Sequence, residues 1–275
     1  MALTRVLITI KTYPSLSEKY DELVCTAGFR EDGSMIRIYP VPFRKLDYDR
    51  QYKKYQWIEI DLEKRNADFR PESYKPVDID KAFTISEFID SGRWDERRSL
   101  VLSDVYTNMT LLIDKAKDKN DRISLAVLKP RQVLDFIWEP VNPEWDSVKL
   151  DRIRAKALQG NLFGENGEIP FEVVKKLPYK FSYVFTTDDD KERTLMIEDW
   201  ELGMLYWNCL EKANGNEEIA CQKVKEKYFN FMMKRDLFFY LGTTLRHHNK
   251  APNPFIIIGV FYPPKLPPRQ LKLNL

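Results

Sequence analysis

An Asp-Gly pair near the start of the chain constrains the fold more than any other short segment. Asp32-Gly33 separates two runs with strand character, ELVCTAGFR at 22–30 and SMIRIY at 34–39. Such a pair favours a tight β-hairpin, because glycine adopts positive φ at little cost. Two further segments alternate apolar and polar residues, as half-buried strands do: 4–13 and 57–62. The first sixty residues therefore predict about four strands, most of them antiparallel neighbours.

The rest of the chain mixes helical and strand patterns. Helical spacing is found in four segments: 79–89, 96–117, 200–212 and 217–235. Six runs predict strands: 123–128, 132–139, 179–187, 192–197, 237–241 and 255–262. Proline, asparagine and glycine are frequent over 140–170, which predicts a boundary or a long connection.

These patterns predict an α+β protein in two parts. Residues 1–145 are expected to form a mainly antiparallel, β-barrel-like half with inserted helices. Residues 146–275 are expected to form a second α+β domain, with a β-hairpin, two helices and two further strands. The proline-rich tail after residue 262 is not expected to join a sheet, because proline lacks the backbone donor.

The composition argues against several kinds of protein and site. No apolar run approaches the roughly 18–20 residues that a membrane-spanning helix needs, and the first residues lack a signal-peptide pattern. We therefore expect a cytoplasmic protein without a membrane partner. Three scattered cysteines and two adjacent histidines argue against a disulfide framework and a Cys/His zinc site. The patterns GxGxxG, GxxxxGK[ST] and GxSxG are absent, and no cofactor is expected.

Residues 36–57 (IRIYPVPFRKLDYDRQYKKYQW) mix aromatic rings and cations almost one for one. The segment has a local surplus of four positive charges, although the whole chain has a net charge of only +2. Exposed rings stack on bases with about 1–3 kcal/mol each, and cations attract phosphates. We predict a nucleic-acid-binding surface with phosphate contacts from Arg37, Arg44, Lys53 and Lys54, and base stacking on Tyr48, Tyr52 and Tyr55. The alternative is structural, with Tyr39, Phe43 and Trp57 in a core and the cations as a solvated rim.

Two motifs around the predicted hairpin resemble the opening of prokaryotic dual OB-domain proteins. They are Val24-Cys25-Thr26-Ala27-Gly28 and Asp32-Gly33-Ser34-Met35-Ile36-Arg37, against a family pattern of Cys-x-Ala-Gly and then Gly-x-Trp-Ile-Arg-Pro. The chain departs from that pattern at Met35, where an aromatic is expected, and in the delayed Pro40. The resemblance covers at most the first quarter of the chain. It implies a small barrel whose curved face accepts oligonucleotides or similar polymers, with Arg37 and Thr26 lining the groove. We describe the expected N-terminal half as OB- or PUA-like.

Carboxylates gather at a predicted strand–helix junction, Glu198-Asp199-Trp200-Glu201. Asp199 and Glu201 are candidate ligands of a divalent metal, as nucleases and phosphoesterases require. The alternative is a helix start, where Asp199 caps backbone N–H groups and Glu201 suits the helix dipole.

The polar loop 242–250 (GTTLRHHNK) lies between two strands that read as buried. Arg246 and Lys250 are candidates for gripping phosphate, and His247 or His248 for general acid–base catalysis. The alternative is an ordinary polar turn. Cys25 follows an apolar residue in a strand, so a buried thiol is favoured over a nucleophile.

Two main functional hypotheses follow. The first is a protein that binds single-stranded or locally opened DNA or RNA through the basic–aromatic β surface. The alternative is a metal-dependent or histidine-assisted enzyme that acts on nucleic acid or nucleotides, by nuclease, base or phosphodiester chemistry. A divalent metal is expected only for that enzyme. A scaffold that binds a protein partner is a third hypothesis.

Overall fold

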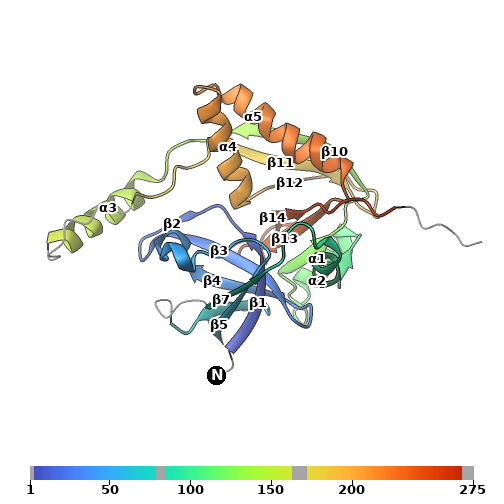
Figure 1. Ribbon diagram of the computed structural model, residues 1–275, viewed down its shortest axis with the longest axis horizontal. Helices are drawn as coiled ribbons and strands as arrows, with labels where there is room; N and C mark the ends of the chain where they lie inside the picture. Colours follow the sequence, from blue (N-terminus) through green and yellow to red (C-terminus); the bar gives the residue numbers. More distant parts are fainter. Residues whose placement is uncertain (1–2, 79–83, 163–171, 268–275) are drawn as a thin grey trace, which may run out of the picture.

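Five strands of the N-terminal part close into a β-barrel (Figure 1). The computed structural model describes residues 3–78, 84–162 and 172–267. The barrel strands are β1 (Leu3–Lys11), β3 (Asp21–Arg30), β4 (Met35–Val41), β5 (Gln56–Lys64) and β6 (Ser73–Pro76). Their order is β1-β3-β4-β6-β5, and β5 pairs again with β1. Only the β4–β6 pairing among these is parallel, so the predicted barrel-like, mainly antiparallel half is confirmed.

The hairpin predicted at Asp32-Gly33 is also confirmed. Gly33 has a φ of +81°, which explains why glycine is needed there. The Asp32 carboxylate accepts a 2.8 Å hydrogen bond from the Ser34 backbone N–H. The Arg30 N–H donates to the Ser34 carbonyl at 2.9 Å and closes the turn.

The barrel encloses an apolar core. Its fully or nearly fully buried members are Val6, Ile8, Val24, Ile36, Ile38, Val41, Phe43, Tyr52, Ile58, Ile60 and Leu62. Two short strands extend the sheet outside the closed ring: β2 (Ser15–Ser17) pairs with β3, and β7 (Thr84–Phe88) pairs with β5. The predicted helix over 79–89 is therefore wrong at 84–88, because pairing with β5 outweighs the weak helical spacing; residues 79–83 lie outside the described ranges.

Gly28 allows β3 to pass close to β1. A Cβ added at Gly28 would lie 2.0 Å from the Leu7 carbonyl oxygen, so the strands would have to separate. We expect Gly28→Ala to lower the free energy of unfolding by about 2–3 kcal/mol, measured by urea denaturation. Gly215→Ala is the matched control, because Gly215 has positive φ but no atom within 4 Å of the added Cβ. Equal costs for the two variants would contradict the steric explanation.

Two sheets form the C-terminal part. One has the order β14-β13-β9-β8, built from β8 (Val105–Tyr106), β9 (Leu125–Leu128), β13 (Phe238–Thr243) and β14 (Phe255–Phe261). The other is antiparallel and consists of β10 (Gln132–Pro140), β11 (Tyr179–Thr186) and β12 (Arg193–Met196). A parallel bridge between Ile197 and Ile257 links the two.

The four-stranded sheet lies between the barrel and the other C-terminal elements (Figure 1). Tyr240 and Ile258 on one face share a buried cluster with Ile10 and Phe29 of the barrel strands. Phe239, on the other face, belongs to the larger cluster of the three-stranded sheet and the helices. Apolar packing therefore holds the barrel and the C-terminal sheets together over the middle of the molecule.

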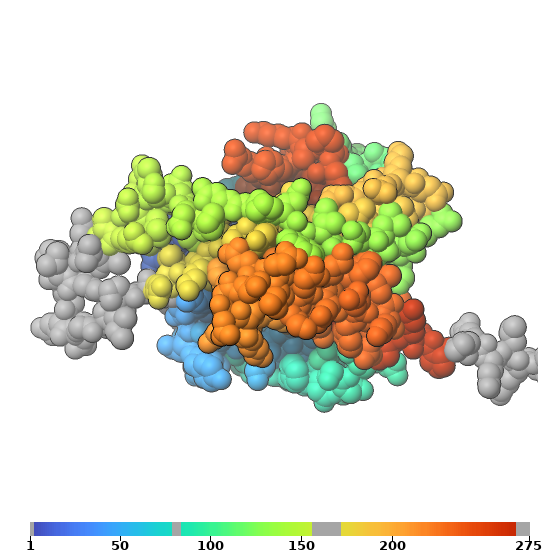
Figure 2. All heavy atoms as spheres, turned by 90° about the horizontal axis from the view of Figure 1, so that it is seen from above, coloured from blue at the N-terminus to red at the C-terminus, as the bar shows by residue number. Residues whose placement is uncertain are grey.

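Five α-helices are present in the described residues: α1 (Trp94–Val101), α2 (Met109–Lys117), α3 (Ser147–Leu162), α4 (Trp200–Lys212) and α5 (Glu217–Lys225). Figure 2, a view from above, shows α4 and α5, in orange, in the middle of the face turned to the viewer, and α3, in yellow-green, extending to one side. The prediction for 200–212 is confirmed, and the one for 217–235 holds through α5 and the irregular helical turns 226–234.

One further helix prediction needs correction. The predicted helix over 96–117 is divided into α1 and α2, because β8 between them pairs with β9. The stretch 140–170, predicted to be a boundary or connection, contains α3. The division at residue 145 stays a prediction. Residues 262–267 of the tail are in no strand, and residues 268–275 lie outside the described ranges. None of the helices described combines the length and the apolarity that crossing a bilayer requires.

Candidate functional site

The tyrosines predicted to stack on bases point in different directions. Tyr48 is 92% exposed. Tyr52 lies in the barrel core, where it is 1% exposed and its hydroxyl hydrogen-bonds with that of Thr26. Tyr55 packs under Arg97, whose Cζ is 3.8 Å from the ring centroid, and burial raises the pKa of Tyr55 to about 12. The three rings therefore do not form one continuous surface.

The predicted cations of the same segment are also separated. Lys54 is buried, and its Nζ lies 2.9 Å from Asp199 and 3.0 Å from Glu201. Arg44 donates to Glu22 at 2.7 Å, whereas Lys53 is exposed.

Asp199 and Glu201, the predicted metal ligands, hold Lys54 between the barrel and α4. Asp199 is also the N-cap of α4 and accepts from the Glu201 N–H at 3.0 Å. Burial opposes the charge of Lys54, but the two carboxylates outweigh it and raise the pKa of this ammonium. Among the described residues, no three His, Cys, Asp or Glu side chains gather closely enough to hold a metal ion.

The histidine loop contains one buried and one exposed ring. His248 is fully buried, and its Nε2–H donates to the Ala116 carbonyl at 2.8 Å. Its Nδ1 therefore accepts from the Thr243 hydroxyl at 2.7 Å, and burial lowers the pKa of the ring. His247, Arg246 and Lys250 are exposed.

A cavity of about 380 Å³ lies where the barrel meets loop 242–246, and we call it the cleft. Its barrel side consists of Thr12, Tyr13, Ser15, Cys25, Arg37, Tyr39, Arg65 and Arg70. Its C-terminal side consists of Glu198, Gly242, Thr243, Thr244, Leu245, Arg246, Ile256 and Ile258. The cleft brings together Arg37 and Arg246, two residues predicted from distant parts of the sequence.

Arg37 acts as a strut at the floor of the cleft, which means that its guanidinium joins the barrel to the C-terminal part by hydrogen bonds. Its Nη1 donates to the hydroxyls of Ser73 at 3.0 Å and Ser124 at 2.8 Å. Its Nη2 donates to the carbonyls of Ser124 at 3.0 Å and Thr243 at 3.4 Å. Arg37 also hydrogen-bonds with the Cys25 thiol, whose pKa is raised by burial. Because a guanidinium has five N–H donors, these partners use nearly all of them.

Arg70 adds a second connection at the same place. It donates to both oxygens of Asp68, at 2.8 and 2.6 Å, and to the Thr243 carbonyl. The two arginines thus attach β13 to the barrel, and Thr243 is their shared acceptor.

The mouth of the cleft combines an aromatic ring with exposed charge. Tyr39 is half-buried, and the Arg65 Cζ lies 5.0 Å from its ring centroid. Arg246 and Thr244, on the C-terminal side, are exposed. A planar ligand with a negative charge matches this arrangement, because the ring and the guanidinium plane supply stacking surfaces.

Glu198 is half-buried in the lining of the cleft, and no described side chain hydrogen-bonds or pairs with its carboxylate. Burial raises the pKa of this group. The carboxylate lies close enough to Cys25 to raise the pKa of that thiol further.

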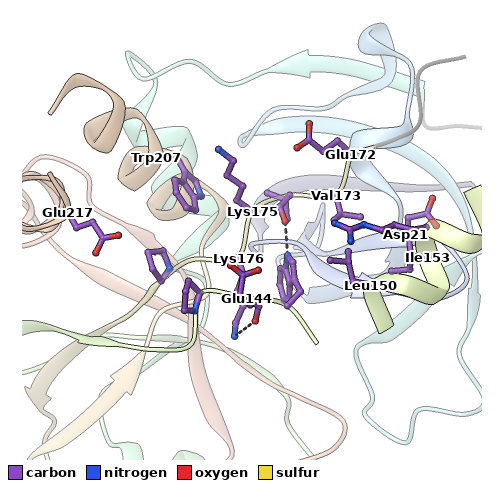
Figure 3. Close-up of a pocket in the computed structure, with 15 residues that line it drawn as sticks. Asp21, Glu144, Leu150, Ile153, Glu172, Val173, Lys175, Lys176, Trp207 and Glu217 are labelled. Carbon is purple, nitrogen blue, oxygen red and sulfur yellow. Dashed lines mark hydrogen bonds between the residues drawn. The ribbon is translucent and has the colours of Figure 1, made fainter. Parts of the chain in front are cut away.

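A larger cavity, of about 770 Å³, lies between α3 and α4 (Figure 3). Figure 3 shows Trp207 of α4 and Leu150 of α3 on opposite sides, with Val173 on the extended segment between them. Its charged lining is mixed: Asp21, Glu144, Arg154, Glu172, Lys175, Lys176 and Glu217. That balance gives it no preference for a polyanion.

Sequence reasoning did not propose Tyr39, Arg65 or Glu198 as site residues. Tyr39 was assigned to the core alternative, and Glu198 was noted only beside the candidate metal ligands.

Three sequence signals pointed to the cleft: the basic–aromatic segment and the resemblance, which share Arg37, and the polar loop, which contains Arg246. Thr26, which the resemblance placed in the groove, is instead buried beside Tyr52.

Comparison with family models gives two matches. Domain of unknown function (DUF8758) matches residues 2–103, and Domain of unknown function (DUF8757) matches residues 105–275, which is more than half of the chain. No curated protein matches the chain. The cleft lies between the two matched regions: its barrel side comes from the first and Glu198 and loop 242–246 from the second.

Proposed function

This chain belongs to the family described as Domain of unknown function (DUF8757), and we propose that it binds single-stranded or locally opened nucleic acid in the cleft. The observation that carries the proposal is the position of the cleft on the barrel.

The strand order supports an OB-type barrel. Numbered along the chain, the five barrel strands pair in the order 1-2-3-5-4 and close on strand 1, with strands 3 and 5 parallel. OB-folds are five-stranded Greek-key barrels that bind oligonucleotides on strands 2 and 3 and on the loops that join strands 1–2 and 4–5. In this chain these are β3, β4 and the connections 12–20 and 65–72, and all four contribute residues to the cleft.

The side chains at the mouth suit a nucleotide. Tyr39 and Arg65 offer the ring and the guanidinium plane on which unpaired bases stack. Arg246 supplies an exposed charge for a phosphate.

A second hollow gives a path for the neighbouring nucleotides. It is lined by Phe69, Lys117, Lys119, Arg122, Asn249, Lys250, Ala251 and Pro252, with four cationic and no acidic side chains. Phe69 directly precedes Arg70 of the cleft, and its ring packs against His248 at 5.1 Å. The two hollows therefore share the loops at one end of the barrel, and Lys250 serves as a phosphate contact outside the cleft.

We expect Tyr39→Ala to bind a fluorescent oligo-dT strand about tenfold more weakly than wild type, because one stacking surface is lost. Fluorescence anisotropy measures the affinity. Tyr48→Ala is the matched control: Tyr48 is far more exposed but lies outside the cleft, so we expect its affinity to be unchanged. If Tyr48→Ala weakens binding and Tyr39→Ala does not, the site lies on the surface of residues 44–53 and not in the cleft.

Salt dependence tests the phosphate contacts in the same assay. The affinity of wild type is expected to fall as salt rises, and Arg246→Gln is expected to make that slope shallower. An affinity that does not change with salt, or the absence of binding to any single strand, would refute the proposal.

The enzyme alternative has less support from the arrangement of its residues. Both ring nitrogens of His248 are occupied by Thr243 and Ala116. Asp199 and Glu201 are engaged with Lys54, away from the histidine loop.

A further inference from the structure

Glu198 is held in place by its backbone and its neighbour. Its N–H donates to the Ile257 carbonyl at 2.8 Å, directly after the bridge between Ile197 and Ile257. The next residue, Asp199, is turned toward Lys54 and caps α4. The two adjacent carboxylates therefore lie in different environments: Asp199 forms an ion pair, and Glu198 lines the cleft.

Each fully or nearly fully buried carboxylate in the described residues has a cationic partner. These pairs are Asp21–Lys45, Glu22–Arg44, Asp68–Arg70 and Asp199–Lys54. Glu198 is only half-buried and has no such partner, and this partial burial raises the pKa of its carboxyl. A carboxylate that is desolvated without a partner is costly to the folded protein, and a ligand that donates hydrogen bonds to it recovers that cost.

The two arginines at the floor of the cleft donate their hydrogen bonds to groups other than the Glu198 carboxylate. Arg37 is occupied by two hydroxyls, two carbonyls and the Cys25 thiol. Arg70 is occupied by Asp68 and the Thr243 carbonyl. The Glu198 carboxylate is therefore available to accept hydrogen bonds from a bound molecule, which in the proposed function is a nucleotide.

Among the four bases, guanine presents two adjacent donors, N1–H and the N2 amino group, to a carboxylate. Adenine and cytosine present one amino group beside an acceptor nitrogen, which repels the second carboxylate oxygen. Thymine presents one N–H between two carbonyl oxygens. A bidentate contact to a base edge is the kind of pairing that discriminates between bases.

We propose that Glu198 makes the cleft prefer guanine, by accepting hydrogen bonds from its N1–H and N2 amino groups; this inference rests on the proposed binding of nucleic acid. Tyr39 would stack on the base while Glu198 reads its edge.

The first test changes only the ligand. A single guanosine placed within oligo-dT should raise the affinity of wild type about tenfold over oligo-dT alone. Inosine, which lacks the N2 amino group, should lose most of that gain. 7-Deazaguanosine, which keeps both donors, should retain it.

The second test changes the protein. We expect Glu198→Gln to bind oligo-dT like wild type and to lose the tenfold preference for guanosine, because the amide replaces one acceptor by a donor. Glu192→Gln, at an exposed glutamate, is the matched control and should keep the preference. Thermal unfolding of both variants shows whether they are folded.

The outcomes separate the two proposals. Salt-dependent binding with no preference for guanosine, or a preference that survives Glu198→Gln, overturns the inference and leaves the proposed function in place. A preference for another base that Glu198→Gln abolishes overturns the choice of guanine. If no strand binds at all, the proposed function fails, and the inference fails with it.

Discussion

We expect the Lys54→Met substitution to lower the free energy of unfolding by about 3–5 kcal/mol relative to wild type. The substitution leaves Asp199, whose side chain is fully buried, without its nearest cation. Glu201 is about half exposed and is solvated by water, so Asp199 accounts for most of the loss. Urea denaturation measures the change.

Lys11 limits the size of this effect. Burial, and then repulsion from Lys54, lower the pKa of Lys11 to about 8. Removing Lys54 relieves that repulsion and leaves Lys11 as a second cation near Asp199. We therefore expect the loss to lie at the lower end of the range.

A double variant separates the buried charge from other effects of the substitution. Lys54→Met with Asp199→Asn removes both charges, and asparagine remains a good N-cap for α4. We expect the double variant to recover at least half of the stability that Lys54→Met loses. Lys180→Met is the matched control, because its pair with Glu139 is exposed and should be worth about 0–1 kcal/mol. A double variant less stable than Lys54→Met would contradict the explanation.

The second large effect is expected at Arg37. Arg37→Met removes the donors to two hydroxyls and two carbonyls, all on segments that meet beneath the cleft. The two carbonyls keep another donor, because the Thr243 N–H donates to the Ser124 carbonyl and Arg70 donates to the Thr243 carbonyl. The loss therefore comes from the charge-assisted hydrogen bonds themselves, each worth about 1.5–3 kcal/mol. Because these contributions do not add fully, we expect a loss of about 3–5 kcal/mol in urea denaturation. Arg37→Lys should recover little, since an ammonium cannot reproduce the planar fork.

The same variant distinguishes a strut from a phosphate contact. If Arg37 acts as a strut, stability and oligonucleotide affinity fall together, because the cleft loses its alignment. If the predicted phosphate contact dominates, affinity and its salt dependence fall while stability stays near that of wild type. Arg152→Met, at an exposed arginine of α3, should change neither.

Local patterns were sufficient for the elements whose neighbours lie close in sequence. Asp32-Gly33 predicted the β3–β4 hairpin because the turn chemistry is contained in a few residues. The helix at 200–212 was predicted for the same reason, since Asp199 caps it locally. The single helix predicted over 96–117 failed because β8 gains its hydrogen bonds from β9, some twenty residues further along the chain.

The candidate site was beyond the reach of such patterns. Tyr48, Tyr52 and Tyr55 look equivalent in sequence, yet one is exposed, one fills the barrel and one lies under Arg97. An alternation of rings and cations is typical both of a binding surface and of a packed β-core, and only the packing of the rest of the chain distinguishes them.

The sequence by itself determined the α+β class, the N-terminal hairpin, most of the strands and helix α4, because these depend on alternation, turn residues and caps within short windows. The tertiary structure alone decided which charges are struts and which face a cavity. Lys54 meets Asp199 and Arg37 meets Ser124 across long stretches of chain, and the cleft draws on residues from Thr12 to Ile258. Burial and charge pairing are set by the three-dimensional neighbours of a side chain, and those neighbours exist only after the barrel has closed against the C-terminal sheet.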